Sequence, residues 1–357
     1  MDKIIINILK KIEKSGFKAY VVGGYVRDYI LGIETNDVDI CTNARPIDIK
    51  EIFNLNKLSN DEYGNINIKT KKYNIDITTF RREKNYDKHS PKSIDYVDDV
   101  KIDLQRRDFT MNSILIDSKG NIIDYYDGVK DIKDKVIKCI GKTDFKLKED
   151  PLRILRALRF SIIYNFKLDD EIKLFIKSNK HLIKNISYYR KKEELDKILF
   201  CKNKLEGLKI LNDLKLDKEL EISYKNIKYS SDILGMYTQI DFSSNYPFTK
   251  NEKDIINKVR EILNNNVIDN NIIYKYGLYI SSIAGEIIGY SYKDIYKMYK
   301  MLPIKSRKDI KISIESIVKL NNNCYNNINK IYLMLEKKIL NGSLKNKSKD
   351  IIKFIRK

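Results

Sequence analysis

A change of residue pattern near Gly141 divides this chain into two parts of different architecture. Eight of the 14 glycines lie before residue 142, among short β-rich runs that alternate with helical patterns. Such short strands, separated by helices and ended by turn residues, indicate a mixed α/β domain. Strands are expected at Ala19–Val22, Val38–Cys41, Ile66–Lys69, Asn74–Thr79, Ser113–Asp117 and Ile122–Tyr125, and helices at Lys3–Lys14, Val26–Leu31 and Pro46–Phe53.

The rest of the chain shows the spacing of successive amphipathic helices. Ile154, Leu158 and Ile162 recur every four residues, which places them on one buried helix face. Pro151 suits the first turn of this helix, where its missing N–H costs nothing. The predicted fold class is therefore α+β, an α/β part followed by an all-helical remainder. Its first helices are expected at Pro151–Ile163, Asp169–Ser178, Tyr189–Leu199 and Leu205–Leu214.

The charge balance permits a polyanionic partner without requiring one. The 357 residues include 69 Lys and Arg against 49 Asp and Glu, a formal net charge of +20. Basic side chains displace counterions from phosphates, which favours a nucleic-acid partner. A/T-rich codon usage would produce the same abundance of Lys, Asn and Ile without any binding, so both explanations stay open.

Several classes of protein are excluded. The cysteines are far apart and form no CxxC pair, so neither a disulfide scaffold nor a cysteine zinc site is expected. We expect them to be structural and buried. No apolar stretch approaches the roughly 18 residues of a membrane helix, and the N-terminus lacks a secretory pattern. These features predict a soluble, cytoplasmic protein.

A pair of glycines, Gly23 and Gly24, lies between an expected strand and an expected helix. Backbone N–H groups of such a turn can approach a phosphate, and the helix N-terminus adds its positive end. Arg27, one turn further on, can clamp the same anion. An ordinary tight turn is the alternative.

Three carboxylates follow on the expected strands. Asp37 and Asp39 are two residues apart, so they project from the same face of a strand. Their repulsion is relieved by a cation, and hard oxygen ligands suit Mg²⁺. A solvated strand face is the alternative for this pair. Asp76, a third acid within a β-branched run, favours a two-metal phosphoryl-transfer site.

These motifs resemble, in order, those of the tRNA nucleotidyltransferase and poly(A) polymerase family, the class II branch of the polymerase-β-like superfamily. The opening signature is Gly23-Gly24-x-Val26-Arg27-Asp28, followed by Asp37-x-Asp39. Residues 106–114 are similar to the RRDxTxNA segment, 122–132 resemble the hinge between head and neck, and 149–160 resemble the EDxxR helix. The motifs lie within the first 200 residues.

The resemblance implies a catalytic head at 1–140, a helical neck at 141–200 and a helical, tRNA-binding body and tail at 201–357. It implies template-independent addition of CCA to tRNA 3′ ends from CTP and ATP, with Mg²⁺ as cofactor and pyrophosphate as leaving group. It also implies that Asp37, Asp39 and Asp76 are catalytic, with Mg²⁺ on Asp37 and Asp39. The nucleotide-binding residues would be Gly24, Arg27, Arg107, Asp150, Arg153, Arg156 and Arg159.

In the EDxxR segment, Asp150 and Arg153 would offer an acceptor and a donor to the Watson–Crick edge of the base. Such a pair can distinguish C and A from G and U. If the whole segment is one helix, Asp150 and Arg159 lie on nearly opposite sides of it. A surface helix with i, i+3 ion pairs is the alternative. For Arg107, the alternative to a phosphate contact is pairing with Asp108 or a head carboxylate. Asp108 and Asn112 are expected to fix the backbone or contact the sugar.

The chain departs from the family pattern at Tyr189, where Glu is usual, and at Tyr25, where a smaller residue is usual. Residues 81–97 match the family's mobile loop and by sequence are a polar loop. Neither His89 nor His181 precedes an Asp, so no metal phosphohydrolase domain is expected. The alternative functions are CC-adding, A-adding or poly(A)-adding enzymes, or a catalytically silent RNA-binding protein.

Overall fold

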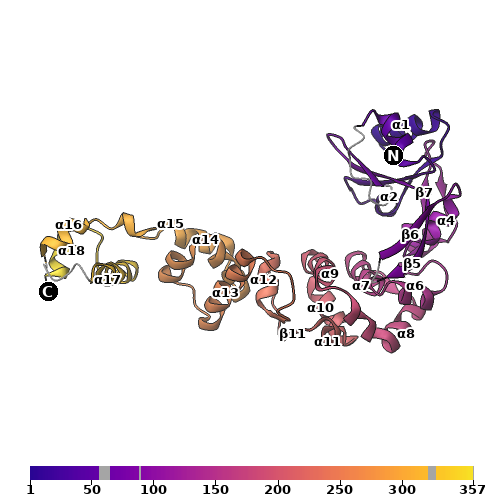
Figure 1. Ribbon diagram of the computed structural model, residues 1–357. Coiled ribbons are helices and arrows are strands. Elements are labelled where there is room, and N and C mark those ends of the chain that lie inside the picture. Colours follow the sequence, from indigo (N-terminus) through magenta and orange to yellow (C-terminus); the bar gives the residue numbers. More distant parts are fainter. Residues whose placement is uncertain (56–64, 88–89, 321–326, 357) are drawn as a thin grey trace. The chain divides into compact units, whose positions relative to one another are not determined.

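The computed structural model describes residues 1–55, 65–87, 90–320 and 327–356. The chain forms two compact units, Met1–Glu221 and Ile222–Lys357 (Figure 1). The predicted boundaries after residues 140 and 200 lie within the first unit and stay predictions.

The first unit is built on a six-stranded mixed sheet with the strand order β3-β4-β2-β1-β7-β8. Strands β2 and β4 are parallel, and the other neighbours are antiparallel. This sheet confirms the predicted mixed α/β head. The strands are β1 (Ala19–Val22), β2 (Asp37–Thr42), β3 (Asn65–Lys69), β4 (Asn74–Thr79), β7 (Leu115–Ile116) and β8 (Ile122–Ile123).

Alternation along β2 separates the core from the site. Val38 and Ile40 are each only 1% exposed, whereas Asp37 and Asp39 point to the opposite, solvent-accessible face. Helix α1 (Lys3–Lys14) packs against strand β1. The apolar stripe on this helix, Ile5, Leu9 and Ile12, is fully buried. The sheet therefore keeps its acids on the face that the core does not occupy.

Six of the remaining helices of the first unit, α2, α3 and α7 to α10, agree with the predicted ones to within one or two residues, and the other six given below were not predicted. Pro151 is the N-cap of α7, immediately before its first residue. The helices are α2 (Gly24–Leu31), α3 (Pro46–Phe53), α4 (Val100–Gln105), η2 (Thr110–Asn112), α5 (Gly128–Lys133), α6 (Thr143–Glu149), α7 (Leu152–Tyr164), α8 (Asp170–Asn179), η3 (Lys180–Asn185), α9 (Tyr188–Phe200), α10 (Lys204–Asp213) and α11 (Leu216–Leu220).

The remainder after residue 141 is largely rather than entirely helical. Strand β10 (Lys167–Leu168) pairs with β9 (Val136–Ile137), and β11 (Ile222–Tyr224) pairs with β12 (Ile240–Phe242). Strands of two or three residues are too short for the alternation that identifies a strand in a sequence.

The prediction of a polar loop at 81–97 is wrong for the described residues. Strands β5 (Arg81–Asp87) and β6 (Ser90–Tyr96) form an antiparallel ribbon. The polar composition of both strands conceals the pairing, because neither has an apolar face to reveal it. His89 lies outside the described residues.

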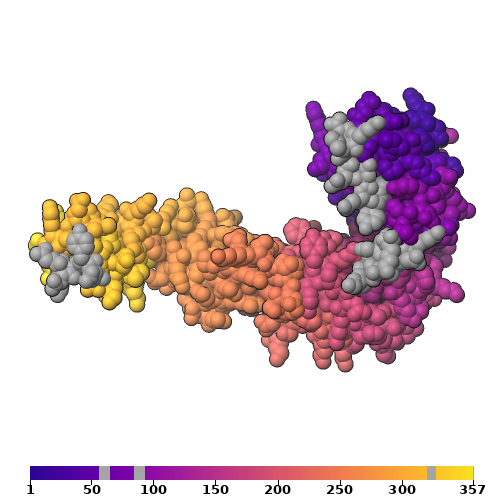
Figure 2. All heavy atoms as spheres, viewed as in Figure 1, coloured from indigo at the N-terminus to yellow at the C-terminus, as the bar shows by residue number. Residues whose placement is uncertain are grey.

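The second unit has its own apolar core, shared by helices α13 to α18. The space-filling view shows side chains closing the gaps between its ribbons (Figure 2). Its helices are α12 (Ile233–Thr238), α13 (Lys250–Asn265), α14 (Asn270–Ile288, kinked at Gly277), α15 (Tyr292–Lys300), η4 (Arg307–Asp309), α16 (Ile314–Leu320), α17 (Ile328–Leu340) and α18 (Ser348–Ile355). Within the described part of both units, no helix is long and apolar enough to cross a membrane.

The cysteines are not paired with one another where the structure describes them. Cys41 and Cys139 are buried, as predicted, while Cys201 is half-buried. Cys324 lies outside the described residues.

Candidate active site

The register of the parallel strands β2 and β4 brings the predicted acids together. Asp39 lies directly opposite Asp76, and Asp37 lies opposite Asn74. Asn67 on β3 donates from Nδ2 to Asp76 Oδ1 at 2.7 Å and to Asn74 Oδ1 at 2.9 Å. Asn67 thus orients the third acid, a role that nothing in the sequence indicated because it depends on the pairing of β3 with β4.

Asp39 lies between the glycine turn and Arg107, and its side chain is exposed to solvent. Desolvation raises the pKa of Asp39; the Arg107 charge opposes this shift, while the negative charges of Asp76 and Asp37 add to it. The backbone N–H of Gly24 also donates to Asp39. This carboxylate is therefore a group whose ionised form needs a nearby positive charge.

Gly23 makes this close approach possible. It caps α2 with φ 76° and ψ −139°, and a Cβ there would lie 2.8 Å from Asp39 Oδ2. A side chain is excluded both by the backbone conformation and by the carboxylate. The neighbouring Tyr25 is buried and packs against Tyr29 and Tyr73, so the larger residue is accommodated on the side of the turn away from Asp39.

Arg27 is a buried arginine whose orientation is fixed by two neighbours. Its Nε and Nη2 donate to the two carboxylate oxygens of Asp28 at 2.9 and 3.0 Å, and its Nη1 donates to Asn112 Oδ1 at 2.8 Å. The sequence predicted Arg27 as an anion clamp but did not indicate that Asp28 would hold it.

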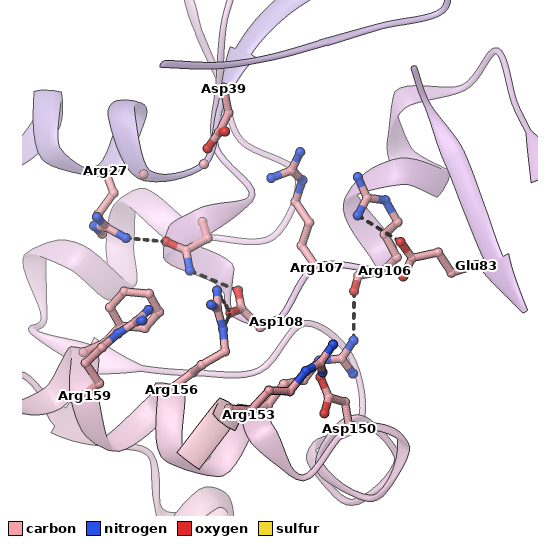
Figure 3. Close-up of a pocket in the computed structure, with 15 residues that line it drawn as sticks. Arg27, Asp39, Glu83, Arg106, Arg107, Asp108, Asp150, Arg153, Arg156 and Arg159 are labelled. Carbon is pink, nitrogen blue, oxygen red and sulfur yellow. Dashed lines mark hydrogen bonds and ion pairs between the residues drawn. The ribbon is translucent and has the colours of Figure 1, made fainter. Parts of the chain in front are cut away.

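Arg107 lies on the other side of Asp39 from Arg27 (Figure 3). Its Nη2 is 3.5 Å from Asp103 Oδ2, and its buried Nε has no hydrogen-bond partner among the described residues. The ion pair with Asp103 is the pairing with a head carboxylate that the sequence left open. It leaves part of the guanidinium available to a ligand.

Asp103 itself is a buried acid that sequence analysis missed. Burial opposes its ionisation, but Arg106 and Arg107 outweigh that effect and hold the pKa of Asp103 below its usual value. Arg106 Nε donates to Asp103 Oδ1 at 2.8 Å, and its Nη1 reaches Glu83 Oε1 on the β5–β6 ribbon at 3.3 Å. The ribbon is thereby joined to the RRDxTxNA segment.

Asp150 precedes α7 rather than lying on it. Its backbone is extended, and its carboxylate accepts the N–H of Leu152 at 3.1 Å. The expectation that Asp150 and Arg159 lie on opposite sides of one helix is therefore wrong, and both line the same cavity. Arg153 donates from Nη1 to Glu149 Oε2 at 2.6 Å and from Nη2 to the Arg106 carbonyl at 3.1 Å.

The next two arginines of α7 are held by one carboxylate each. Arg156 Nε donates to Asp108 Oδ2 at 2.7 Å, and Arg159 Nη1 donates to Glu194 Oε1 at 3.0 Å. Asp108 also accepts the N–H of Phe109 at 2.8 Å, which confirms that it fixes the backbone. Glu194, on α9, thus braces α7.

These side chains surround a cavity of about 560 Å³, within the range typical of small-molecule sites (Figure 3). Seven arginines and four carboxylates line it, so it favours a polyanion. Eight of the ten predicted site residues are among the lining; Asp37 and Asp76 lie beside it on the sheet. The lining is Gly23, Gly24, Arg27, Asp39, Glu83, Arg106, Arg107, Asp108, Asn112, Asp150, Arg153, Arg156, Arg159, Phe160 and Arg190.

The acids on the sheet could bind a magnesium ion only if a substrate supplied some of its ligands. Among the residues that the structure describes, no group of three or more His, Cys, Asp or Glu side chains is arranged to hold a metal by itself. Mg²⁺ in nucleotide sites is commonly bound by one or two carboxylates, with phosphate oxygens and water completing its shell. The Asp39 carboxylate, with its raised pKa and acidic neighbours, fits that donor set.

Two family models match the chain: "Poly A polymerase head domain" at residues 19–138, and "Probable RNA and SrmB- binding site of polymerase A" at 165–221. A CCA-adding enzyme of Ligilactobacillus salivarius is 33% identical over 349 residues, covering 88% of this chain and 86% of that protein. The chain also resembles the Bacillus stearothermophilus CCA-adding enzyme in complex with CTP (TM-score 0.87, 22% identity, 99% and 97% of the two chains). A third match is the Thermotoga maritima enzyme complexed with tRNA_CCA (TM-score 0.71, 22% identity, 99% and 95%).

The fold and the arginine-lined cavity beside paired acids thus define the class, a nucleotidyltransferase with a polymerase-β-like head. Within that class, the relatives that match this chain over most of their length are CCA-adding enzymes. The chain belongs to the family of class II CCA-adding enzymes and poly(A) polymerases, and it is a CCA-adding enzyme of that family.

Proposed function

We propose that this enzyme adds C, C and A in turn to tRNA 3′ ends, using CTP and ATP with Mg²⁺ and releasing pyrophosphate, in the cytoplasm. The observation that carries the assignment of the site is the position of Asp39, between the glycine turn, Arg107 and Asp76. An acid on one wall and arginines on the others are the parts that triphosphate binding and phosphoryl transfer require.

We assign the triphosphate to Arg27 and Arg107, with Arg156 and Arg159 bracing the site from α7. Arg107 lines the cavity, and the part of its guanidinium outside the ion pair with Asp103 can form a charge-assisted bond to phosphate. The amides of the Gly23-Gly24 turn lie at the N-terminus of α2, which also favours negative charge. These groups stabilise the charge that accumulates on the leaving pyrophosphate.

Base selection is assigned to Asp150 and Arg153. The Glu149 carboxylate and the Arg106 carbonyl hold Arg153 at the cavity wall, and Asp150 is held by the first turn of α7. A donor and an acceptor fixed on rigid supports can discriminate bases by hydrogen bonding without a template strand.

In the reaction, the 3′-hydroxyl oxygen of the primer bonds to the α-phosphorus and the bond from that phosphorus to the bridging oxygen breaks. The hydroxyl proton passes to a carboxylate oxygen of Asp76, which Asn67 orients. Asp37 and Asp39 would hold Mg²⁺, which supplies charge stabilisation to the phosphate oxygens when bound. The protein's own contribution is alignment and the exclusion of water from the arginine-lined cavity.

The test replaces Asp37 and Asp39 together by Ala and follows incorporation of CTP and ATP into tRNA lacking its CCA end. Incorporation should be abolished while tRNA binding persists, because neither acid lies on a surface assigned to tRNA. Asp144→Ala, which removes an exposed acid paired with Lys148, is the matched control. Wild-type turnover in the double variant would refute the assignment.

Product sequencing separates the proposed reaction from its alternatives. Transcripts lacking A, CA or CCA should all be completed to CCA and extended no further. Termination after CC, addition of A alone or extension to poly(A) would assign the corresponding relative. No incorporation with any nucleotide would indicate an RNA-binding protein.

A further inference from the structure

Tyr164, the last residue of α7, contacts the head through its hydroxyl. The hydroxyl donates to Asp28 Oδ1 at 2.9 Å, and Asp28 in turn accepts two hydrogen bonds from Arg27. All three residues lie in the first unit, with Tyr164 on the neck helix and the ion pair on α2. The carboxylate that orients Arg27 is therefore itself oriented from α7.

The same chain of hydrogen bonds continues and returns to α7. Arg27 donates to Asn112 Oδ1 at 2.8 Å, and Asn112 Nδ2 donates to Asp108 Oδ1 at 3.0 Å. Asp108 Oδ2 accepts from Arg156, two helical turns before Tyr164 (Figure 3). Two arginines of the cavity wall thus belong to one closed network whose ends are both on α7.

The Tyr164 ring supports the same arginine directly. The Arg27 guanidinium carbon lies 4.6 Å from the centroid of the Tyr164 ring and 5.1 Å from that of Phe160. Phe160 also lies 6.1 Å from the Tyr164 ring in a stacked arrangement. Arg27 is only 6% exposed, so ring contacts and hydrogen bonds together leave it few alternative orientations.

We propose that Tyr164 is a positioning residue for nucleotide binding: its hydroxyl, acting through Asp28, fixes the Arg27 guanidinium at the cavity wall. Tyr164 is not part of the cavity lining, so it acts only through other residues. The inference rests on the proposed role of Arg27 in binding the triphosphate.

Tyr164→Phe removes the hydroxyl and keeps the ring. Without the third hydrogen bond to Asp28, the ion pair loses its anchor on α7 and Arg27 samples other orientations. The KM for CTP and for ATP should rise by about three- to tenfold, the upper value corresponding to about 1.4 kcal/mol. Both should rise by the same factor because the triphosphate is common to both, while the KM for tRNA and the preference between the bases stay unchanged.

Tyr188→Phe is the matched control. The Tyr188 hydroxyl also donates to a carboxylate in the first unit, Glu221 Oε2 at 2.7 Å, but Tyr188 does not line the cavity. Its removal should leave both nucleotide KM values at the wild-type level. Thermal unfolding of the two variants compares the structural cost of losing the same kind of hydrogen bond.

A double-mutant cycle with Arg27→Gln tests whether the effect passes through Arg27. In the Arg27→Gln background, Tyr164→Phe should add no further increase in nucleotide KM. An increase that persists there, or an unchanged KM in Tyr164→Phe alone, would overturn the inference while leaving the role of Arg27 intact. An unchanged nucleotide KM in Arg27→Gln itself would overturn the proposed triphosphate contact, and the inference with it.

Discussion

Replacing Gly23 by Ala tests the geometry that surrounds Asp39. The added Cβ would lie 2.8 Å from Asp39 Oδ2, closer than carbon and oxygen approach without a bond between them. The carboxylate, as the movable partner, must retreat by several tenths of an ångström. Its bond with the Gly24 amide and its distance to Arg107 change in consequence.

Two effects contribute to the expected magnitude. The backbone at φ 76° and ψ −139° is accessible almost only to glycine, so the variant should lose about 1–3 kcal/mol of unfolding free energy. Displacing a group in the reacting geometry by a fraction of an ångström to one ångström costs up to about 100-fold in rate. We therefore expect kcat to fall by about 10- to 100-fold in protein that remains folded.

The assay is single-turnover incorporation of CTP, with the folded fraction measured by circular dichroism. Gly32→Ala is the control, because Gly32 ends the same helix with φ 70° and has no atom within 4 Å of an added Cβ. It should lose about 1 kcal/mol of stability and no activity. A folded Gly23→Ala enzyme with the wild-type kcat would refute the reasoning.

Three further predictions concern base choice, pH and salt. Arg153→Ala should raise the use of GTP and UTP relative to CTP and ATP by about tenfold or more, with little change in tRNA affinity; an unchanged preference in competition assays would contradict the selector role. Burial, aided by the Arg153 charge, lowers the pKa of Lys146 to about 8, so the unfolded chain binds this proton more tightly and wild-type stability should rise between about pH 8 and 10. Lys146→Met should accordingly be more stable than the wild type near pH 7 by up to about 3 kcal/mol. The difference should shrink toward pH 10 in urea unfolding, and a difference independent of pH would exclude this cause. The tRNA affinity should fall steeply with ionic strength in filter binding, and an affinity insensitive to salt would assign the excess of Lys to composition.

The sequence was sufficient for features that depend on local periodicity. The two-residue spacing of Asp37 and Asp39 predicted a shared strand face, and the structure shows both acids opposite the apolar side of β2. The boundaries of α1, α3, β1 and β4 were predicted to the residue, since each has a strong apolar pattern or a proline at its start.

Features that depend on contacts between distant segments were not predictable in the same way. Asp103 reads as one more acid on a short helix, yet it is fully buried beneath two arginines of the site. The position of Asp150 before α7, rather than on it, depends on the extended backbone between two helices. Glu83 reaches Arg106 only because β5 and β6 pair as a ribbon.

The hydrogen bonds that hold Arg153 determine which substitutions the site can tolerate during evolution. Besides Glu149, its acceptors include the backbone carbonyls of Arg106 and Lys146, at 3.1 and 2.9 Å. A carbonyl is present whatever side chain its residue carries, so mutations at positions 106 and 146 leave these two acceptors in place. Substitutions at those two positions therefore leave the orientation of Arg153 unchanged. Of the three acceptors, only the Glu149 carboxylate can be removed by a single substitution.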